Sequence, residues 1–193
     1  MSQYQHREVE ASEAAERVTF DAQAIPEIIL SISPCRSGTT ALLRVFGSAG
    51  LESHYQPLKN ILRWRMQGEE MRWGLPRAAR LYLKETLGPY TLQEAQFDPL
   101  AALLQAGVPA GRLRVFVAGR VPLNCWASWT GWWGGRTCVE IFIEAYRTTE
   151  MIRRRALALG IPATVFAYEA IRDNGGELAI SRLFARLGVD FVP

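Results

Sequence analysis

The chain has 193 residues, of which 49% are hydrophobic, and a formal net charge of +3. This length suffices for one well-packed α/β domain and is short for two, and the mild, dispersed charge suits a small anionic ligand while arguing against a nucleic-acid partner. No apolar run reaches the roughly 18–20 residues that a membrane span needs, so we expect no membrane partner.

The cysteines and the N-terminal residues indicate the cellular compartment. Cys35, Cys125 and Cys138 are odd in number and form no CxxC motif, so we expect neither a disulfide framework nor a zinc site, and a reducing environment. Residues 1–20 are polar and carry acids throughout, unlike a signal or transit peptide. We therefore expect a cytoplasmic protein, and leave open whether it forms a homo-oligomer.

In chain order, a polar N-terminal extension over residues 1–24 precedes a single domain over residues 25–193. Short apolar runs of the kind that parallel sheets use predict four buried strands and a weaker fifth, and helical patterns separate them. The alternation predicts an α/β fold of three layers, with a central parallel sheet of about five strands and ligands beyond the carboxyl ends of those strands. The predicted strands are residues 28–33, 51–55 (the weaker one), 80–84, 113–118 and 163–167, and the clearest helices are 39–49 and 139–159.

The stretch PCRSGTT joins the first strand to the first helix. Gly38 allows a tight turn, and the N–H groups that follow, with the positive end of the helix, favour an anion. Arg36 adds a full charge, and Ser37, Thr39 and Thr40 add hydroxyl groups. A plain strand-to-helix turn is the alternative, but the density of these groups favours phosphate or sulfate. The leading glycine and the lysine of the ATP-binding GxxxxGK[ST] loop are absent.

PCRSGTT after an apolar strand resembles the phosphosulfate-binding loop of the sulfotransferases, and its RSGTT is closest to the bacterial branch. The resemblance implies a P-loop domain like that of the nucleotide kinases, with 3′-phosphoadenosine 5′-phosphosulfate (PAPS) as co-substrate and no metal. It covers about residues 28–189. LYLKETLGPY resembles the segment whose lysine, here Lys84, faces the transferred group, FAYEAI resembles the segment near the adenine, and LFARLGV resembles the late helix. On this resemblance the donor is bound by Arg36, Ser37, Gly38, Thr39, Thr40 and Tyr168.

A second part of the family pattern follows the predicted strand over residues 113–118. In sulfotransferases an arginine at the end of a strand and a serine eight residues later hold the 3′-phosphate, and LRVFVAGRVPLNCWASW offers Arg120 and Ser128 at that spacing. Pro122 is suited to start the helix, and two turns later the serine faces back toward the strand end. This pair would distinguish the donor from ATP, which has no 3′-phosphate. The family often has an acidic residue directly after this arginine, whereas this chain has Val121 at that position.

The implied reaction is in-line transfer of a sulfuryl group to a hydroxyl or amine of a small-molecule acceptor, with Arg36 and Lys84 neutralising charge. A hydroxyl acceptor also needs a general base. Where the family often has a glutamate before proline, this chain has Gln56, which cannot take a proton. We rank His54 first as the base, Glu85 second and Glu52 third, with His54 as a merely structural residue almost as well supported.

The segment CWASWTGWWGGRT brings four tryptophans close to the predicted donor site. Trp126 and Trp129 share a helical face and are predicted to be core residues, whereas Trp132 and Trp133 are predicted to lie in a turn, where they would either pack or grip an apolar or aromatic acceptor. Two other functions stay open at this point. One is a small-molecule kinase of the same fold, and the other, suggested by Gln56, is a nucleotide-binding protein without catalysis.

Overall fold

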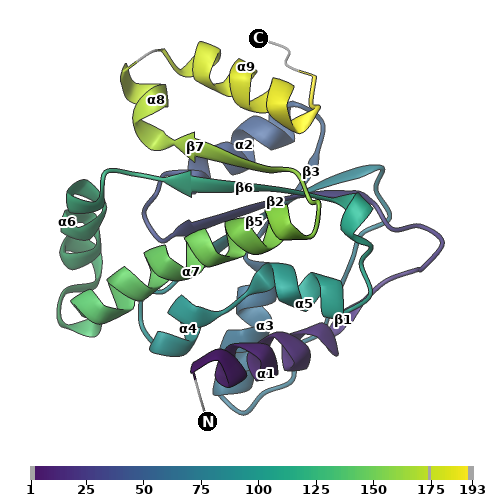
Figure 1. The fold of residues 1–193 in the computed structure, drawn as a ribbon, viewed down its shortest axis with the longest axis horizontal. Helices are drawn as coiled ribbons and strands as arrows, with labels where there is room; N and C mark the ends of the chain where they lie inside the picture. Colours follow the sequence, from purple (N-terminus) through teal and green to yellow (C-terminus); the bar gives the residue numbers. More distant parts are fainter. Residues whose placement is uncertain (1–2, 174, 191–193) are drawn as a thin grey trace.

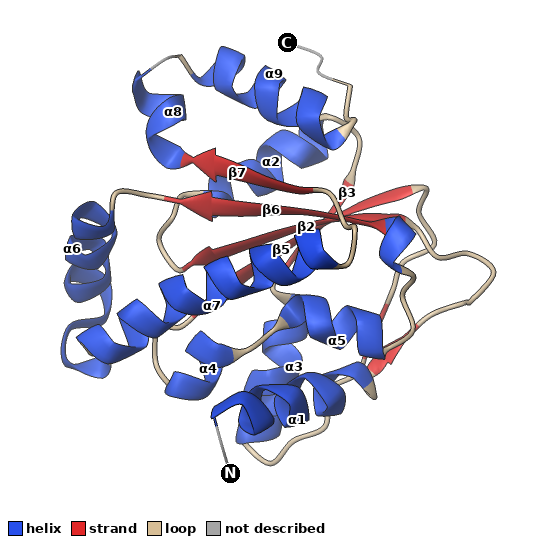
Figure 2. Ribbon diagram, in the orientation of Figure 1, coloured by secondary structure: helices blue, strands red, loops and turns tan. Residues whose placement is uncertain are grey.

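The computed structural model describes residues 3–173 and 175–190, and its centre is a parallel sheet of five strands (Figures 1 and 2). The strands lie in the order β3-β5-β2-β6-β7. Each coincides with one of the predicted apolar runs, so the prediction of a central parallel sheet is confirmed. Their bounds are β2 (Glu27–Pro34), β3 (Glu52–Tyr55), β5 (Arg80–Leu87), β6 (Leu113–Gly119) and β7 (Ala163–Ala167).

Helices cover both faces of this sheet, which makes the three layers expected from the sequence (Figure 2). One face carries α2 (Thr39–Ser48) and α9 (Gly176–Leu187), with α8 (Tyr168–Asp173) beside them. Helix α6 (Pro122–Trp133) stands at the arrowhead end of the strands. The other face carries α1 (Gln3–Ala15), α3 (Pro57–Met66), α4 (Leu92–Gln96), α5 (Pro99–Gln105) and α7 (Val139–Ala158).

None of the helices within the described residues is both long enough and apolar enough to cross a membrane.

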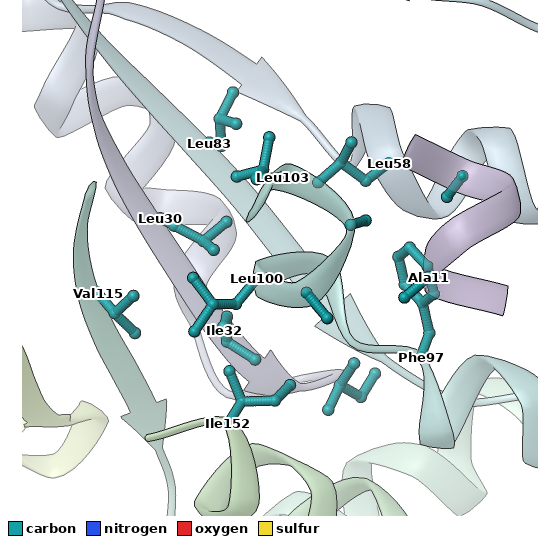
Figure 3. Packing of buried hydrophobic residues seen from close by; sticks show 14 of the residues in the cluster. Ala11, Leu30, Ile32, Leu58, Leu83, Phe97, Leu100, Leu103, Val115 and Ile152 are labelled. Carbon is teal, nitrogen blue, oxygen red and sulfur yellow. The ribbon is translucent and has the colours of Figure 1, made fainter. Parts of the chain in front are cut away.

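The alternation of side chains along β2 builds two hydrophobic cores, one on each face. Leu30 and Ile32 pack on the face of α3, α5 and α7, where Figure 3 shows them beside Leu83, Val115 and Leu100. On the opposite face Ile29, Tyr82 and Phe46 belong to the core beneath α2 and α9. Full burial of one such aliphatic or aromatic side chain contributes roughly 1.5–3 kcal/mol relative to exposure, so both layers are held firmly to the sheet.

The N-terminal segment, for which the sequence predicts a polar extension over residues 1–24, packs against the domain. Ala11 and Ala14 of α1 are buried in the core on the α3 and α5 side. A two-residue strand, β1 (Val18–Thr19), then pairs in parallel with β4 (Trp73–Gly74). Small residues on one side of an otherwise polar helix therefore give it a packing face.

The strand order places a crevice at the end of β2. The connection that leaves β2 runs toward the β3 edge of the sheet, whereas the connections that leave β3, β5 and β6 run toward the β7 edge. The helix that follows β2 consequently lies on one face of the sheet, and the helices that follow its neighbour β5 lie on the other. The loops at the carboxyl ends of these two strands therefore diverge. Ligands of open parallel sheets bind at such a position.

Candidate functional site

A cavity of about 320 Å³ lies at the carboxyl ends of the strands. All five strands contribute to it, either with their last residues or with the residues that follow them. Its volume is within the usual range for small-molecule sites. The lining residues are Cys35, Arg36, Gly38, Thr39, Thr40, Ala41, Tyr55, Gln56, Lys84, Thr86, Arg120, Trp133 and Tyr168.

The loop between β2 and α2 forms one wall of this cavity. Arg36 and Gly38 both have left-handed backbones, with φ of 67° and 82°, so the chain turns sharply before α2 begins at Thr39. No side chain of the N-cap residue Gly38 covers the first turn of α2, and the free N–H groups of a helix start favour an anion. Thr39 and Thr40 line the cavity, whereas Ser37 is buried beneath the loop and does not.

The guanidinium of Arg36 is held by α6. Its Nε donates to the Ser128 hydroxyl at 2.9 Å, and its Cζ lies 4.5 Å from the centre of the Trp132 ring. Ser128 therefore contacts the arginine of the loop and does not itself line the cavity. A hydrogen bond and a cation–π contact from one helix fix the direction of this flexible side chain.

Arg120 follows β6 and shares the cavity with Tyr168. Its guanidinium carbon lies 5.2 Å from the centre of the Tyr168 ring, and its Nη1 is 3.5 Å from the carbonyl oxygen of Arg36. Its own carbonyl accepts a hydrogen bond from the Tyr146 hydroxyl at 3.0 Å. Glu169 accepts from the N–H of Val121 at 2.9 Å, so the start of α8 is tied to the residue after Arg120.

Lys84 and Tyr55 face the cavity from adjacent strands. They lie opposite each other in the β3–β5 register, and the Lys84 Nζ is 4.0 Å from the centre of the Tyr55 ring. The side chain of Lys84 is buried, and this burial lowers the pKa of its ammonium to about 8 because a charge is less well solvated there. Lys84 is thus a cation in the cavity whose proton is unusually easy to remove.

The structure does not bring His54 or Glu85 into the cavity. Both lie on the α3 side of the sheet, one position out of phase with Tyr55 and Lys84. His54 bonds Glu52 through its Nε2 at 3.0 Å, and Glu52 is likewise absent from the described lining. The Glu85 carboxylate accepts from the N–H groups of Leu58 at 2.8 Å and Lys59 at 3.2 Å at the start of α3. Burial raises the pKa of Glu85 to about 7.

Two further polar residues line the cavity: Gln56, considered from the sequence only as a residue that cannot be the base, and Thr86, which sequence reasoning missed. Gln56 is buried with φ of 53°, its N–H donates to the carbonyl of Lys84 at 2.8 Å, and its amide donates to the hydroxyl of Thr86. A non-glycine residue with a left-handed backbone is strained and is often found at functional sites. Thr86 could have been predicted, because residues i and i+2 of a strand share a face and Lys84 was already assigned to the site.

The end of α6 differs from the sequence prediction. Trp132 and Trp133 were expected in a turn, but α6 continues through both, and Gly134 is the residue that ends it. The helix continues because neither tryptophan breaks its pattern before the two glycines. Trp132 is 68% exposed and Trp129 is fully buried, as expected of a core residue. Trp133 lines the cavity and meets Tyr90 edge-on at 6.0 Å between ring centres.

Comparison with protein-family models gives no match for this chain, and a search of the curated proteins gives none either. We therefore infer its function from the chemistry of the cavity.

Proposed function

We propose that the protein is a sulfotransferase that moves a sulfuryl group from PAPS to a hydroxyl or amine of a small acceptor. The observation that carries the proposal is the convergence of three cations, Arg36, Lys84 and Arg120, with the start of α2 on one cavity. Within the described part of the chain, no carboxylate lines that cavity. Such a surface suits a ligand with several negative charges.

The residues of the cavity fit the parts of this donor. The loop residues Gly38, Thr39 and Thr40 would receive the 5′-phosphosulfate, with Arg36 beside them. Arg120, at the end of β6, would bind the 3′-phosphate, and the Tyr168 ring next to it would contact the adenine. Each charge-assisted hydrogen bond of this kind contributes about 1.5–3 kcal/mol. Ser128 would act through Arg36, as a positioning residue.

The surroundings of Glu85 favour PAPS over ATP. Metal-dependent P-loop enzymes hold Mg²⁺ with a hydroxyl of the loop and a strand-end aspartate. The acid of β5 in this protein, Glu85, points to the opposite face and is occupied by two N–H groups of α3. The described cavity lining supplies hydroxyls and cations, a set that suits transfer driven by positioning and charge.

The bond changes of the reaction place the cations in specific roles. The acceptor atom forms a bond to sulfur while the bond from sulfur to the 5′-phosphate oxygen breaks, and that oxygen gains a negative charge. Arg36 and Lys84 would stabilise this charge as it develops. Tyr55 and Trp133 line the same cavity, and their rings would offer a flat apolar surface to an acceptor.

Gln56 supports one alternative, a protein that binds the donor nucleotide without catalysing transfer. It lines the cavity where a carboxylate would be useful, and neither His54 nor Glu85 takes its place. Such a protein would bind adenosine 3′,5′-bisphosphate and never consume PAPS.

Calorimetry tests the proposal by comparing adenosine 3′,5′-bisphosphate with ATP and Mg²⁺. We expect the bisphosphate to bind at least tenfold more tightly. Tighter binding of ATP, or no binding of the bisphosphate, would contradict the proposal. Incubation with PAPS and a panel of hydroxyl and amine acceptors then separates an enzyme from a non-catalytic binder, because only an enzyme yields sulfated products.

A further inference from the structure

The two lysines of this protein stand out from its other cations. Of 22 lysines and arginines, 20 are arginines, and only Lys59 and Lys84 are lysines. Both are buried, at 1% and 2% exposure, whereas the cations at the surface are arginines. Arginine stays charged at any physiological pH, but a buried lysine can lose its proton. A chain that otherwise uses arginine has thus kept the titratable cation at two buried positions.

Only one of these lysines faces the cavity. Lys59 has a carboxylate partner, since its Nζ lies 3.6 Å from Glu94 Oε2, and it also bonds the carbonyl of Gly88. Lys84 lines the cavity and has no carboxylate within salt-bridge distance among the described residues. Its Nζ contacts the face of the Tyr55 ring. The two positions therefore differ in kind: Lys59 is a paired structural cation, and Lys84 is an unpaired one open to a ligand.

The surroundings of Lys84 favour its neutral amine over its ammonium, compared with a lysine in water. Burial does most to lower the pKa of the Lys84 ammonium; Glu85 on its own strand favours the ammonium, and Lys59 and Arg63 of α3 oppose it. Arg36 and Arg120 add two more positive charges to the cavity, and Tyr55 supplies a neutral ring, because burial raises the pKa of its hydroxyl. With a pKa of about 8, about a tenth of the Lys84 side chains carry a neutral amine at pH 7. Enzymes tune lysines into this range when they serve as bases.

We propose that Lys84 is the proton acceptor of the transfer reaction, an inference that rests on the proposed function. The lone pair of the neutral Nζ takes the acceptor's proton as the acceptor's oxygen or nitrogen bonds to sulfur. The electron pair of the broken sulfur–oxygen bond leaves with the 5′-phosphate. The new ammonium then faces a phosphate that has just gained one negative charge. One side chain thus removes the proton and supplies the compensating cation, and it returns the proton to solvent after the products leave.

Nuclear magnetic resonance tests the first half of this inference without any acceptor. Protein labelled with ¹³Cε-lysine gives signals from two side chains only, and the Lys84→Arg variant identifies the one from Lys84. We expect this signal in the free protein to titrate near pH 8, about two and a half pH units below an ordinary lysine. Titration above pH 10 would overturn the inference. Adding adenosine 3′,5′-bisphosphate is expected to raise the midpoint, because the anion favours the ammonium.

Turnover of PAPS in the presence of 2-naphthol tests the second half of the inference, the role of Lys84 as proton acceptor. The measured rate is the sum of transfer to naphthol and transfer to water. Lys84→Arg keeps the charge but cannot become neutral, so it should bind the bisphosphate within about threefold of the native protein and consume PAPS about 100-fold more slowly. Adding Gln56→Glu to this variant supplies a carboxylate at the cavity and should restore part of the rate. The rate should then rise at a lower pH than in the native protein, because a carboxylate loses its proton at lower pH than a lysine. Lys84→Met serves if the arginine disturbs folding.

The outcomes separate the two proposals. If the native protein does not bind the bisphosphate, the proposed function fails. If it binds the bisphosphate and consumes PAPS, but Lys84→Arg or Lys84→Met does so at an undiminished rate, the proposed function stands and only the role of Lys84 is overturned.

Discussion

The ring of Tyr168 lies against the backbone of Gly38, so closely that a Cβ atom at position 38 would fall 2.1 Å from the Cδ2 of that ring. The two residues come from distant parts of the chain, the loop after β2 and the start of α8. Their contact joins the anion-binding loop to the β7 side of the cavity. Gly38 also has φ of 82°. Position 38 therefore requires glycine for two reasons: the left-handed backbone, and the lack of space for a Cβ atom.

Gly38→Ala should therefore destabilise the protein and disturb the cavity. A left-handed alanine and the collision with Tyr168 together should lower the free energy of unfolding by about 1–3 kcal/mol, and bisphosphate affinity should fall at least tenfold. Gly47→Ala is the matched control in α2, because the described residues bring no atom outside its own stretch of helix within 4 Å of its Cβ position and alanine is the better helix former. Denaturant unfolding and calorimetry measure both effects. Equal tolerance at the two positions would contradict this account of Gly38.

Ser128→Ala should weaken donor binding through Arg36. The variant removes the 2.9 Å hydrogen bond to the Arg36 Nε, so the guanidinium becomes more mobile, and we expect bisphosphate affinity to fall about fivefold, or about 1 kcal/mol. Thr130→Ala is the control on the same helix, since its hydroxyl donates to carbonyls of α6 itself. Calorimetry on both variants decides the matter, and an equal effect of the two substitutions would show that Ser128 does not position Arg36.

Arg120→Ala should affect ligands with a 3′-phosphate selectively. Arg120 lines the cavity at the end of β6, so its loss should weaken adenosine 3′,5′-bisphosphate by about tenfold or more while changing adenosine 5′-phosphosulfate little. Arg112→Ala removes an exposed arginine just before the other end of the same strand and should change neither. Equal losses for the two ligands in Arg120→Ala would refute the assignment of the 3′-phosphate.

Glu85 should make stability depend on pH. Its pKa is about 7 in the native protein and 4.5 as the reference value. Between these values the unfolded chain has released a proton that the native protein still binds, so the free energy of unfolding should fall as pH rises across this window, by on the order of 3 kcal/mol. Glu85→Gln should remove this fall, because glutamine does not titrate.

Urea unfolding of the native protein and of Glu85→Gln at pH 5 and pH 8 measures this difference. Glu10, whose pKa burial also raises to about 7, is present in both proteins and cancels in the comparison. The loss of a hydrogen-bond acceptor for α3 should lower the stability of the variant by a similar amount at both pH values. A pH dependence that is the same in the two proteins would show that Glu85 is not its source.

Much of the architecture could be predicted from local sequence. β2, β5, β6 and β7 contain short apolar runs, which can be recognised as strands without knowledge of their neighbours, whereas β3 is polar (ESHY) and was the weaker prediction. The loop after β2 could be predicted because Gly38 and the hydroxyl residues beside it are typical of a phosphate-binding turn. Arg36, Thr39, Thr40, Lys84, Arg120 and Tyr168, all predicted as site residues, do line one cavity.

The assignment of the base could not be made at this level. His54 and Tyr55 are neighbours on one strand, as are Lys84 and Glu85 on another, and neighbours on a strand point to opposite faces. Only one member of each pair can therefore face the cavity. Strand pairing assigns that place to Tyr55 and Lys84, while Glu85 is occupied by the start of α3.

The sequence by itself determined the strands, the turn that follows β2 and the positive charges near it, because each depends on residues close together in the chain. The tertiary structure alone decided that Ser128 holds Arg36 and that Lys84 is buried with no carboxylate of the described residues in salt-bridge distance. Both facts depend on segments that are distant in sequence. The pKa of a lysine is set by its solvation and by the charges around it, and these exist only once the chain has folded.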